Sequence, residues 1–242
     1  MKIPDLHGLI RRRLLVNYRL DPEVAAAQLP SPFRPKLVAG VAIAGVCLIR
    51  LEKIRPAPMP AVLGFSSENA AFRYAVEWEN EFGETCDGVF IPRRDTGSRI
   101  NAISGGRVFP GIHHLSHFQV EDQNERIAIR IDADAERTPL IDLEAIDTEA
   151  FPEESAFSSL DAASRFFETG CLGYSARPCD SELDGLRLEV KDWKVKPVEV
   201  IRLSSAYFDD LTRFPAGSIS FDHALLMRNC THSWRAEPDW EL

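Results

Sequence analysis

Residues 105–118, GGRVFPGIHHLSHF, place one arginine and three histidines close together in a chain that has only six histidines. An imidazole can ligate a metal ion, move a proton near neutral pH, or hydrogen-bond to its neighbours. His113, His114 and His117 are therefore the first candidates for chemistry. Arg107 is a candidate for holding an anion, because a guanidinium binds carboxylates through paired N–H donors.

A metal site is one interpretation of these histidines. On a strand, His113 and His117 would share a face and His114 would point the other way, whereas on a helix His113 and His117 would lie one turn apart. The segment lacks the glutamate of H-E-x-x-H, and no other carboxylate is identified as a third ligand. We predict no metal and no cofactor. A half-buried strand with locally bonded imidazoles and a metal-free active site both stay open.

Several familiar catalytic patterns are missing from the sequence. It contains no G-x-G-x-x-G, no G-x-x-x-x-G-K-[ST] and no G-x-S-x-G, so neither dinucleotide, P-loop nor serine-hydrolase chemistry is indicated. Asp222 and His223 are adjacent. On a strand they should point to opposite faces, and we expect no hydrogen bond between them of the kind a catalytic triad uses.

Composition excludes some partners. The net charge of −9 argues against nucleic acid, because binding a phosphate backbone requires concentrated positive charge. No apolar run reaches the ~18 residues of a membrane span, so we expect no membrane partner. The five cysteines are scattered without a C-x-x-C pair, which favours reduced thiols and a cytoplasmic location. They are Cys47, Cys86, Cys171, Cys179 and Cys230.

Periodicity predicts many strands and few helices. Asp21 can cap a short helix that Pro30 ends, and Ser158 or Ser159 can cap a second that Gly170 ends. The acidic stretch 142–154 is expected to be a surface loop. Strands are expected over 11–20, 41–54, 71–79, 85–91, 98–108, 115–120, 126–132, 186–190, 195–208 and 221–228. The order predicts one α+β domain over residues 1–242, mostly antiparallel, with a closed or nearly closed barrel-like core.

Several segments resemble a known family. VNYRLDPEVAAAQLPSPFRP resembles the opening of the acetoacetate-decarboxylase-like superfamily. Within it, the chain is more similar to the uncharacterised DUF2071 (YqjF-like) family. SSENAAFRYAVEW resembles that family's E-x-N-x-R-x-Y-V strand, and FFETGCLGYS and FPAGSISFDHALLMR resemble its C-terminal half. The resemblance covers nearly the whole chain and implies the same fold and a homo-oligomer.

The resemblance also shows a difference in the reactive segment. Acetoacetate decarboxylase forms a Schiff base through a lysine in a G-R-E-x-x-x-x-P-K-K segment. Here Gly106 and Arg107 match G-R, while Val108, His113, His114 and Leu115 replace the glutamate, the proline, the catalytic lysine and the activating lysine. None of the six lysines of the chain falls in this segment. Because imidazole cannot form the imine, we predict the fold without Schiff-base chemistry.

Two functions follow from this comparison. The resemblance places other functional positions at Arg11 and Glu68, and implies that both converge with Arg107 and His114 inside the barrel. The first hypothesis is an imine-free lyase, hydratase or isomerase acting on a small carbonyl carboxylate. His114 and Glu68 would move protons, and Arg11, Arg107 and His113 would bind the ligand. The alternative is a non-catalytic protein that binds a small anionic ligand through the same residues.

Overall fold

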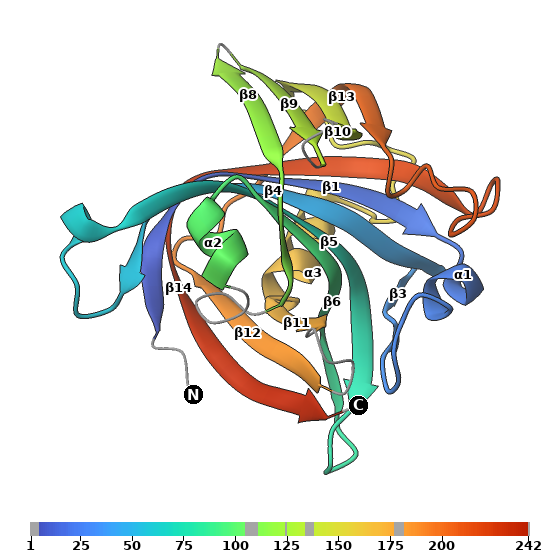
Figure 1. Cartoon of the computed structure of the whole chain (residues 1–242). Helices are drawn as coiled ribbons and strands as arrows, with labels where there is room; N and C mark the ends of the chain where they lie inside the picture. The colour runs from blue at the N-terminus through green and yellow to red at the C-terminus, as the bar shows by residue number, and fades with distance from the viewer. Residues whose placement is uncertain (1–4, 105–110, 124, 134–137, 177–181, 242) are drawn as a thin grey trace.

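The computed structural model describes residues 5–104, 111–123, 125–133, 138–176 and 182–241. Its main feature is a ring of long strands, shown in Figure 1. The strands follow one another around the ring in the order β1 (Leu6–Leu20), β4 (Val41–Pro56), β5 (Phe65–Glu79), β6 (Thr85–Thr96), β11 (Leu172–Ala176), β12 (Glu182–Val190) and β14 (Ile219–Glu241). Pairing of β14 with β1 closes the ring.

A second, smaller sheet packs on the outside of the ring, at the top of Figure 1. It continues from β14 through β13 (Lys196–Ser205), β10 (Pro139–Asp147), β9 (Arg126–Asp132) and β8 (His117–Gln123). Alternate residues of the ring strands, such as Leu14, Leu48 and Phe72, are fully buried against Ile129 and Leu143 of this sheet. The outward face of the ring is therefore largely apolar core, and a second apolar cluster fills part of the inward face around α3 (Leu160–Thr169).

Short elements complete the fold. Asp21 accepts N–H bonds at the start of α1 (Pro22–Ala26), and Ser159 caps α3 (Leu160–Thr169), as predicted. Ala163 and Phe167 of α3 pack on the inward face of the ring. Figure 1 shows α3 inside the ring. The remaining short elements are β2 (Arg34–Pro35), β3 (Leu37–Val38), η1 (Ala61–Leu63), α2 (Arg99–Ser104) and β7 (His113–Leu115).

The predicted fold class, mostly antiparallel sheet with a barrel-like core and a few short helices, is confirmed. None of the helices in the described ranges combines the length and hydropathy needed to cross a lipid bilayer.

Two local predictions are wrong. The expected strand over 98–108 is helical at Arg99–Ser104, because the Ser98 hydroxyl accepts the Asn101 N–H and starts a helical turn. The expected loop over 142–154 begins with strand β10, in which Ile141 and Leu143 face the core. Asp142 and Glu144 point outward and pair with Arg202. The stretch therefore alternates between apolar and acidic residues, as expected for a strand with one exposed face.

Candidate functional site

Three arginines point toward the inside of the ring, and we call them the interior arginine cluster: Arg13 of β1, Arg73 of β5 and Arg94 of β6. They alternate along their strands with residues of the outer core, so the period of two directs them inward. Arg13 and Arg73 are 7% and 6% exposed, and Arg94 is partly buried. The Cys47 side chain of β4 lies on the same face, opposite Leu15 of β1 and Ala71 of β5.

The hydrogen-bond partners of the cluster are neutral. Arg13 Nε donates to Cys47 Sγ at 3.4 Å, and its buried Nη1 has no partner. Arg73 Nη2 donates to Asn17 Oδ1 at 2.9 Å. Arg94 donates to Ser175 Oγ from Nε and Nη2, at 3.1 and 2.9 Å.

No carboxylate in the described ranges forms an ion pair with any of the three guanidinium groups of the cluster, although the charge of Asp184 acts on Arg94 and partly opposes the effect of burial. Burial lowers the pKa of Arg73 to about 10, with a further contribution from the charge of Arg13, and burial lowers the pKa of Arg94 to about 10. All three therefore stay cationic at neutral pH. Because burying an unpaired charge is costly, the arrangement favours a bound anion.

His113 belongs to the same face. Strand β7 runs parallel to β6, with His113 opposite Arg94 and His114 opposite Asp95. His113 is partly buried and contacts the Gly111 carbonyl oxygen through Nδ1 at 3.2 Å. Burial, followed by the charge of Arg94, lowers the pKa of His113 to about 4. At pH 7 this imidazole is neutral and can accept a proton, whereas His114 is exposed.

Asp222 and His223 are bonded to each other, so the expectation that they cannot interact is wrong. His223 Nδ1 lies 2.5 Å from Asp222 Oδ2, and the His223 ring is fully buried. The cause is a β-bulge: Asn17 pairs with His223 and Tyr18 pairs with Phe221, which leaves Asp222 as the extra residue. A bulge interrupts the alternation of faces, and two neighbouring side chains can then meet.

A chain of hydrogen bonds connects this pair to the cluster. Asn17 Nδ2 lies 3.1 Å from His223 Nε2 and can only donate, so His223 carries its proton on Nδ1, toward Asp222. Asn17 Oδ1 in turn accepts from Arg73. The Arg73 guanidinium also lies over the Phe167 ring, 4.8 Å from its centroid. The chain therefore holds Arg73 in one orientation. The sequence contains the Asp222–His223 pair, but nothing in it reveals the bulge.

The hydrogen-bond chain requires a glycine at position 45, next to Asn17. A Cβ on Gly45 would lie 2.4 Å from the Val16 carbonyl oxygen and 3.1 Å from Asn17 Oδ1. Any larger residue at this position would displace the strand or the amide. Gly45 is also opposite Arg73 in the sheet.

The space beside Arg73 is small. A hollow there has a volume of about 10 Å³, roughly enough for one water molecule. Asn17, Arg73, Phe166 and Phe167 line it, together with Lys36. The Lys36 ammonium is bonded to Asp87 and lies 4.7 Å from the centroid of Phe166. No local pattern in the sequence marks Lys36 as part of a site, because it lies far from the histidine segment.

The residues that the resemblance placed at one site lie apart. Arg11 is exposed and donates to Asn229 Oδ1 at 2.7 Å. Glu68 lies on the outward face of β5, and His114 is exposed on β7. Arg107 lies outside the described residues. A register irregularity between Ile10 and Arg12 interrupts the alternation on β1, and Arg13 rather than Arg11 points inward.

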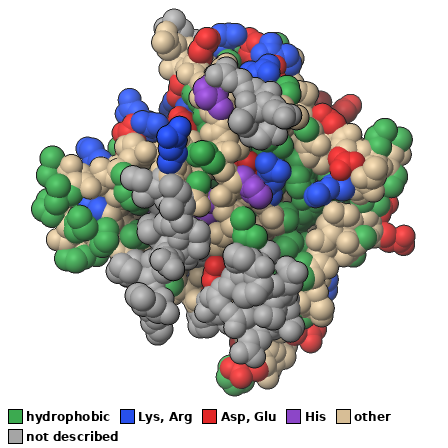
Figure 2. Space-filling model, in the orientation of Figure 1, with side chains coloured by type: hydrophobic (Ala, Val, Ile, Leu, Met, Phe, Trp, Pro, Cys, Tyr) green, Lys and Arg blue, Asp and Glu red, His purple; other side chains and the backbone are tan. Residues whose placement is uncertain are grey.

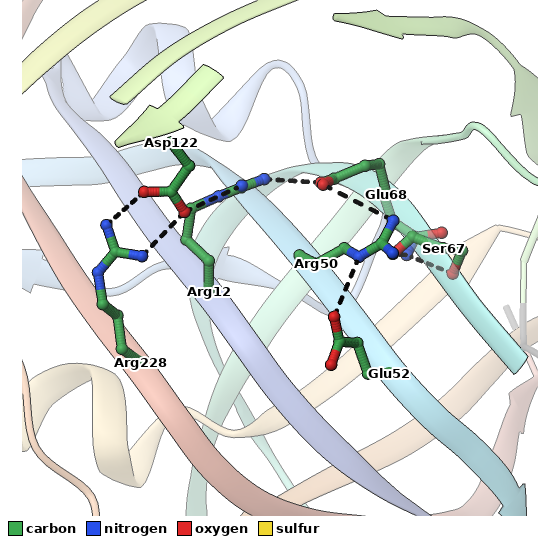
Figure 3. Close-up of polar contacts among 8 residues, drawn as sticks. Arg12, Arg50, Glu52, Ser67, Glu68, Asp122 and Arg228 are labelled. Atoms are coloured by element: carbon green, nitrogen blue, oxygen red, sulfur yellow. Dashed lines mark hydrogen bonds and ion pairs between the residues drawn. The ribbon is translucent and has the colours of Figure 1, made fainter. Parts of the chain in front are cut away.

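Glu68 takes part in an ion-pair network that Figure 3 shows. Its Oε2 accepts from Arg12 at 2.7 Å, and its Oε1 lies 4.0 Å from Arg50. Asp122 of β8 lies 3.5 Å from Arg12 and 2.6 Å from Arg228. Burial raises the pKa of Glu68, and the two arginines oppose this effect. The network joins the ring to the smaller sheet, which indicates a structural role.

The three histidines of the segment do not lie on one strand. His113 lies in β7, while His117 begins β8, so the two belong to different strands. Across the described ranges, no three His, Cys, Asp or Glu side chains gather closely enough to hold a metal ion. Figure 2 shows a histidine next to basic side chains at the centre of this face of the molecule.

The depressed pKa of His113 predicts a loss of stability in acid. In the folded protein the His113 imidazole stays neutral down to about pH 4, whereas a histidine in the unfolded chain titrates near 6.5. The unfolded chain therefore binds more protons between these values, and the free energy of unfolding falls as pH is lowered from 6.5 to 4. Urea unfolding at pH 7.0 and 4.5 should show a smaller acid loss in His113→Gln than in the wild type. Exposed His114→Gln is the control and should lose as much as the wild type; equal losses in all three proteins would contradict the prediction.

Comparison with known proteins gives the same fold. No family model and no curated protein matches the sequence. Acetoacetate decarboxylase from Legionella pneumophila matches with a TM-score of 0.62 at 13% identity, over 98% of this chain and 89% of that one. An acetoacetate decarboxylase-like enzyme from Sphingomonas wittichii RW1 matches with 0.62 at 15% identity, over 98% and 92%. The enduracididine biosynthesis enzyme MppR complexed with pyruvate matches with 0.62 at 10% identity, over 100% and 91%.

Proposed function

We propose that this protein, which has an acetoacetate-decarboxylase-like fold, binds a small carbonyl carboxylate at the interior arginine cluster. The observation that carries the proposal is the set of three inward guanidinium groups without an ion-pair partner among the described carboxylates. A carboxylate would supply the missing negative charge and could accept a hydrogen bond from the unpartnered Nη1 of Arg13. MppR, a protein of the same fold, has been solved with pyruvate bound.

The hollow beside Arg73 limits how such a ligand enters. Its volume of about 10 Å³ admits a water but not pyruvate. The arginine side chains or the rings of Phe166 and Phe167 must change rotamer on binding, as interface side chains commonly do. We therefore expect a ligand of few atoms.

The first hypothesis, an imine-free lyase, hydratase or isomerase, is supported by the position of His113. A neutral imidazole beside Arg94 can take a proton from the carbon next to the ligand's carbonyl group. The electron pair of that C–H bond forms the new C=C bond, the π pair of the C=O bond moves to the oxygen, and the arginines stabilise the resulting enolate. The proton returns from His113 in the reverse step. The competing prediction is that His114 and Glu68, rather than His113, transfer this proton.

The alternative is non-catalytic binding of a small anion. It is favoured because the carboxylates of Glu68 and Asp222 already have hydrogen-bond or ion-pair partners. Glu68 is held by arginines in the outer network, and Asp222 is bonded to His223. Neither is placed against the cluster as a free base. In this case His113 acts only as a hydrogen-bonding group for the ligand.

Hydrogen–deuterium exchange at the methyl group of pyruvate, followed by NMR in D₂O, separates these possibilities. The wild type should bind pyruvate in calorimetry and catalyse the exchange. His113→Ala should abolish the exchange and His114→Ala should retain it; the reverse pattern would return the catalytic role to His114. Binding without exchange supports the non-catalytic alternative, and absence of binding by any small carbonyl carboxylate overturns both.

Borohydride trapping tests the imine-free chemistry separately. Lys36 borders the hollow, but its ammonium is bonded to Asp87. We expect no reduced adduct between pyruvate and the chain, and Lys36→Arg should leave the deuterium exchange unchanged. A pyruvyl adduct on Lys36 would contradict the proposal. The homo-oligomer, the cytoplasmic location and membership of the DUF2071 family stay predictions.

A further inference from the structure

We propose a second anion-binding site, for a small molecule that carries a phosphate group, in a groove at the rim of the ring. The groove has a volume of about 430 Å³ and is distinct from the hollow beside Arg73. It lies where the start of β1 meets the end of β4, the end of β12 and residues 231–233 of β14. We call it the rim groove, and His7, Lys53, Arg55, Lys191 and His232 are its basic and imidazole-bearing lining residues.

The charges of the rim groove are predominantly positive. Lys53 and Lys191 are exposed, and their ammonium groups form no ion pair with the described carboxylates. Arg55 is held by two carbonyl oxygens, of Lys53 and Met59, each at 2.9 Å, so its position is fixed and its charge is not neutralised.

The one acidic residue of the lining, Glu189, is engaged elsewhere. Its Oε1 lies 3.2 Å from Arg235 Nη1 and its Oε2 accepts from the Ser233 hydroxyl at 3.3 Å. A groove with three cationic side chains and one engaged carboxylate is unusual on a chain whose net charge is −9. The local excess of positive charge would attract an anion.

His232 is the second, independent observation. The side chain lines the groove and is only 4% exposed, yet neither ring nitrogen has a partner in hydrogen-bond geometry. Burial, followed by the charges of Arg13 and His7, lowers the pKa of His232 to about 3, and the Cys230 backbone, which falls short of hydrogen-bond geometry, acts in the opposite direction. The ring is packed edge-on against Trp234. A buried polar group without a partner is costly, and a ligand that hydrogen-bonds to the imidazole after a small shift of this side chain would remove that cost.

The chemistry of the lining favours phosphate over carboxylate. The interior cluster consists of arginines, whose planar forks match a planar carboxylate. The rim groove presents two lysines and Arg55, and three cations match the nearly two negative charges of a phosphate monoester better than the single charge of a monocarboxylate. Its volume of about 430 Å³ falls within the range of small-molecule sites, so the ligand is larger than free phosphate. A phosphorylated metabolite of sugar size meets both conditions.

Calorimetric titration of the full chain with ribose 5-phosphate tests the proposal, with ribose, inorganic phosphate and succinate as comparison probes. We expect ribose 5-phosphate to bind most tightly, inorganic phosphate weakly and ribose not at all. Lys53→Gln combined with Lys191→Gln should weaken the ribose 5-phosphate affinity by about 100-fold, or about tenfold for each charge-assisted hydrogen bond removed. Both lysines are exposed, so the variant is expected to fold.

Lys194→Gln is the matched control, because Lys194 is an exposed lysine in the same connection that does not line the groove. It should leave the affinity unchanged. Equal weakening in Lys194→Gln would show attraction by net charge alone and overturn the site. Succinate binding as tight as ribose 5-phosphate would overturn the phosphate assignment, as would an unchanged affinity in the double variant. Pyruvate binding at the interior cluster should be the same in all these proteins.

Discussion

Arg13→Met is expected to stabilise the fold and to abolish carboxylate binding at the same time. Arg13 is 7% exposed, its Nη1 has no hydrogen-bond partner, and its contacts are weak: a hydrogen bond to the Cys47 sulfur and a guanidinium 5.4 Å from the centroid of the Trp193 ring. Replacing a buried charge that lacks a well-formed partner with an apolar side chain of similar length should raise the free energy of unfolding by about 1–4 kcal/mol. Pyruvate affinity should fall about 100-fold, because a charge-assisted pair of donors is removed. Urea unfolding and calorimetry measure the two effects.

The adjacent arginine provides the matched control. Arg12 is 3% exposed and its Nε also has no partner, but it donates to Glu68 at 2.7 Å and lies 3.5 Å from Asp122, on the other face of β1. Arg12→Met breaks a buried ion pair and leaves Glu68 without its main partner, so it should lower the free energy of unfolding by about 3–5 kcal/mol. Pyruvate affinity should not change. If both variants shift stability in the same direction, the distinction between the two faces is wrong.

Asp222→Ala is expected to cause a large loss of stability. The Asp222 carboxylate accepts from the Ser155 hydroxyl at 2.6 Å, the Ala156 N–H at 2.8 Å and His223 Nδ1 at 2.5 Å. These hydrogen bonds lower the pKa of Asp222 although burial opposes them. Truncation leaves three donors without an acceptor, and we expect the free energy of unfolding to fall by about 3–5 kcal/mol. Chemical denaturation at pH 7 gives this value.

The same variant tests the hydrogen-bond chain to the cluster. Without Asp222, His223 and Asn17 are free to reorient, so Arg73 loses its fixed position and pyruvate should bind at least about tenfold more weakly. Glu77→Ala is the control, since it breaks a partly exposed ion pair with Arg34 and should cost less than about 1 kcal/mol. A stability loss for Asp222→Ala no larger than this would contradict the assigned network.

Local patterns in the sequence predicted most of the ring. The strand over 41–54 is β4, and the strands over 85–91 and 126–132 lie within β6 and β9. The caps at Asp21 and Ser159 start helices where expected. Such features depend on a few neighbouring residues, whose alternation or capping side chains act within one turn or one strand. The resemblance of the opening segment to acetoacetate-decarboxylase-like proteins predicted the fold that the solved structures confirm.

The composition of the site depended instead on contacts between distant strands. Bulges near Arg12 and at Asp222 determine which arginine points inward and allow Asp222 to reach His223. A bulge shifts the faces of a strand through its pairing with another strand, and the local pattern of apolar and polar residues carries no sign of it. The sequence alone therefore determined the elements and the presence of candidate arginines and histidines. Only the tertiary structure decided that Arg13, Arg73, Arg94 and His113 share the inward face, because closure of the ring selects the face that each strand presents.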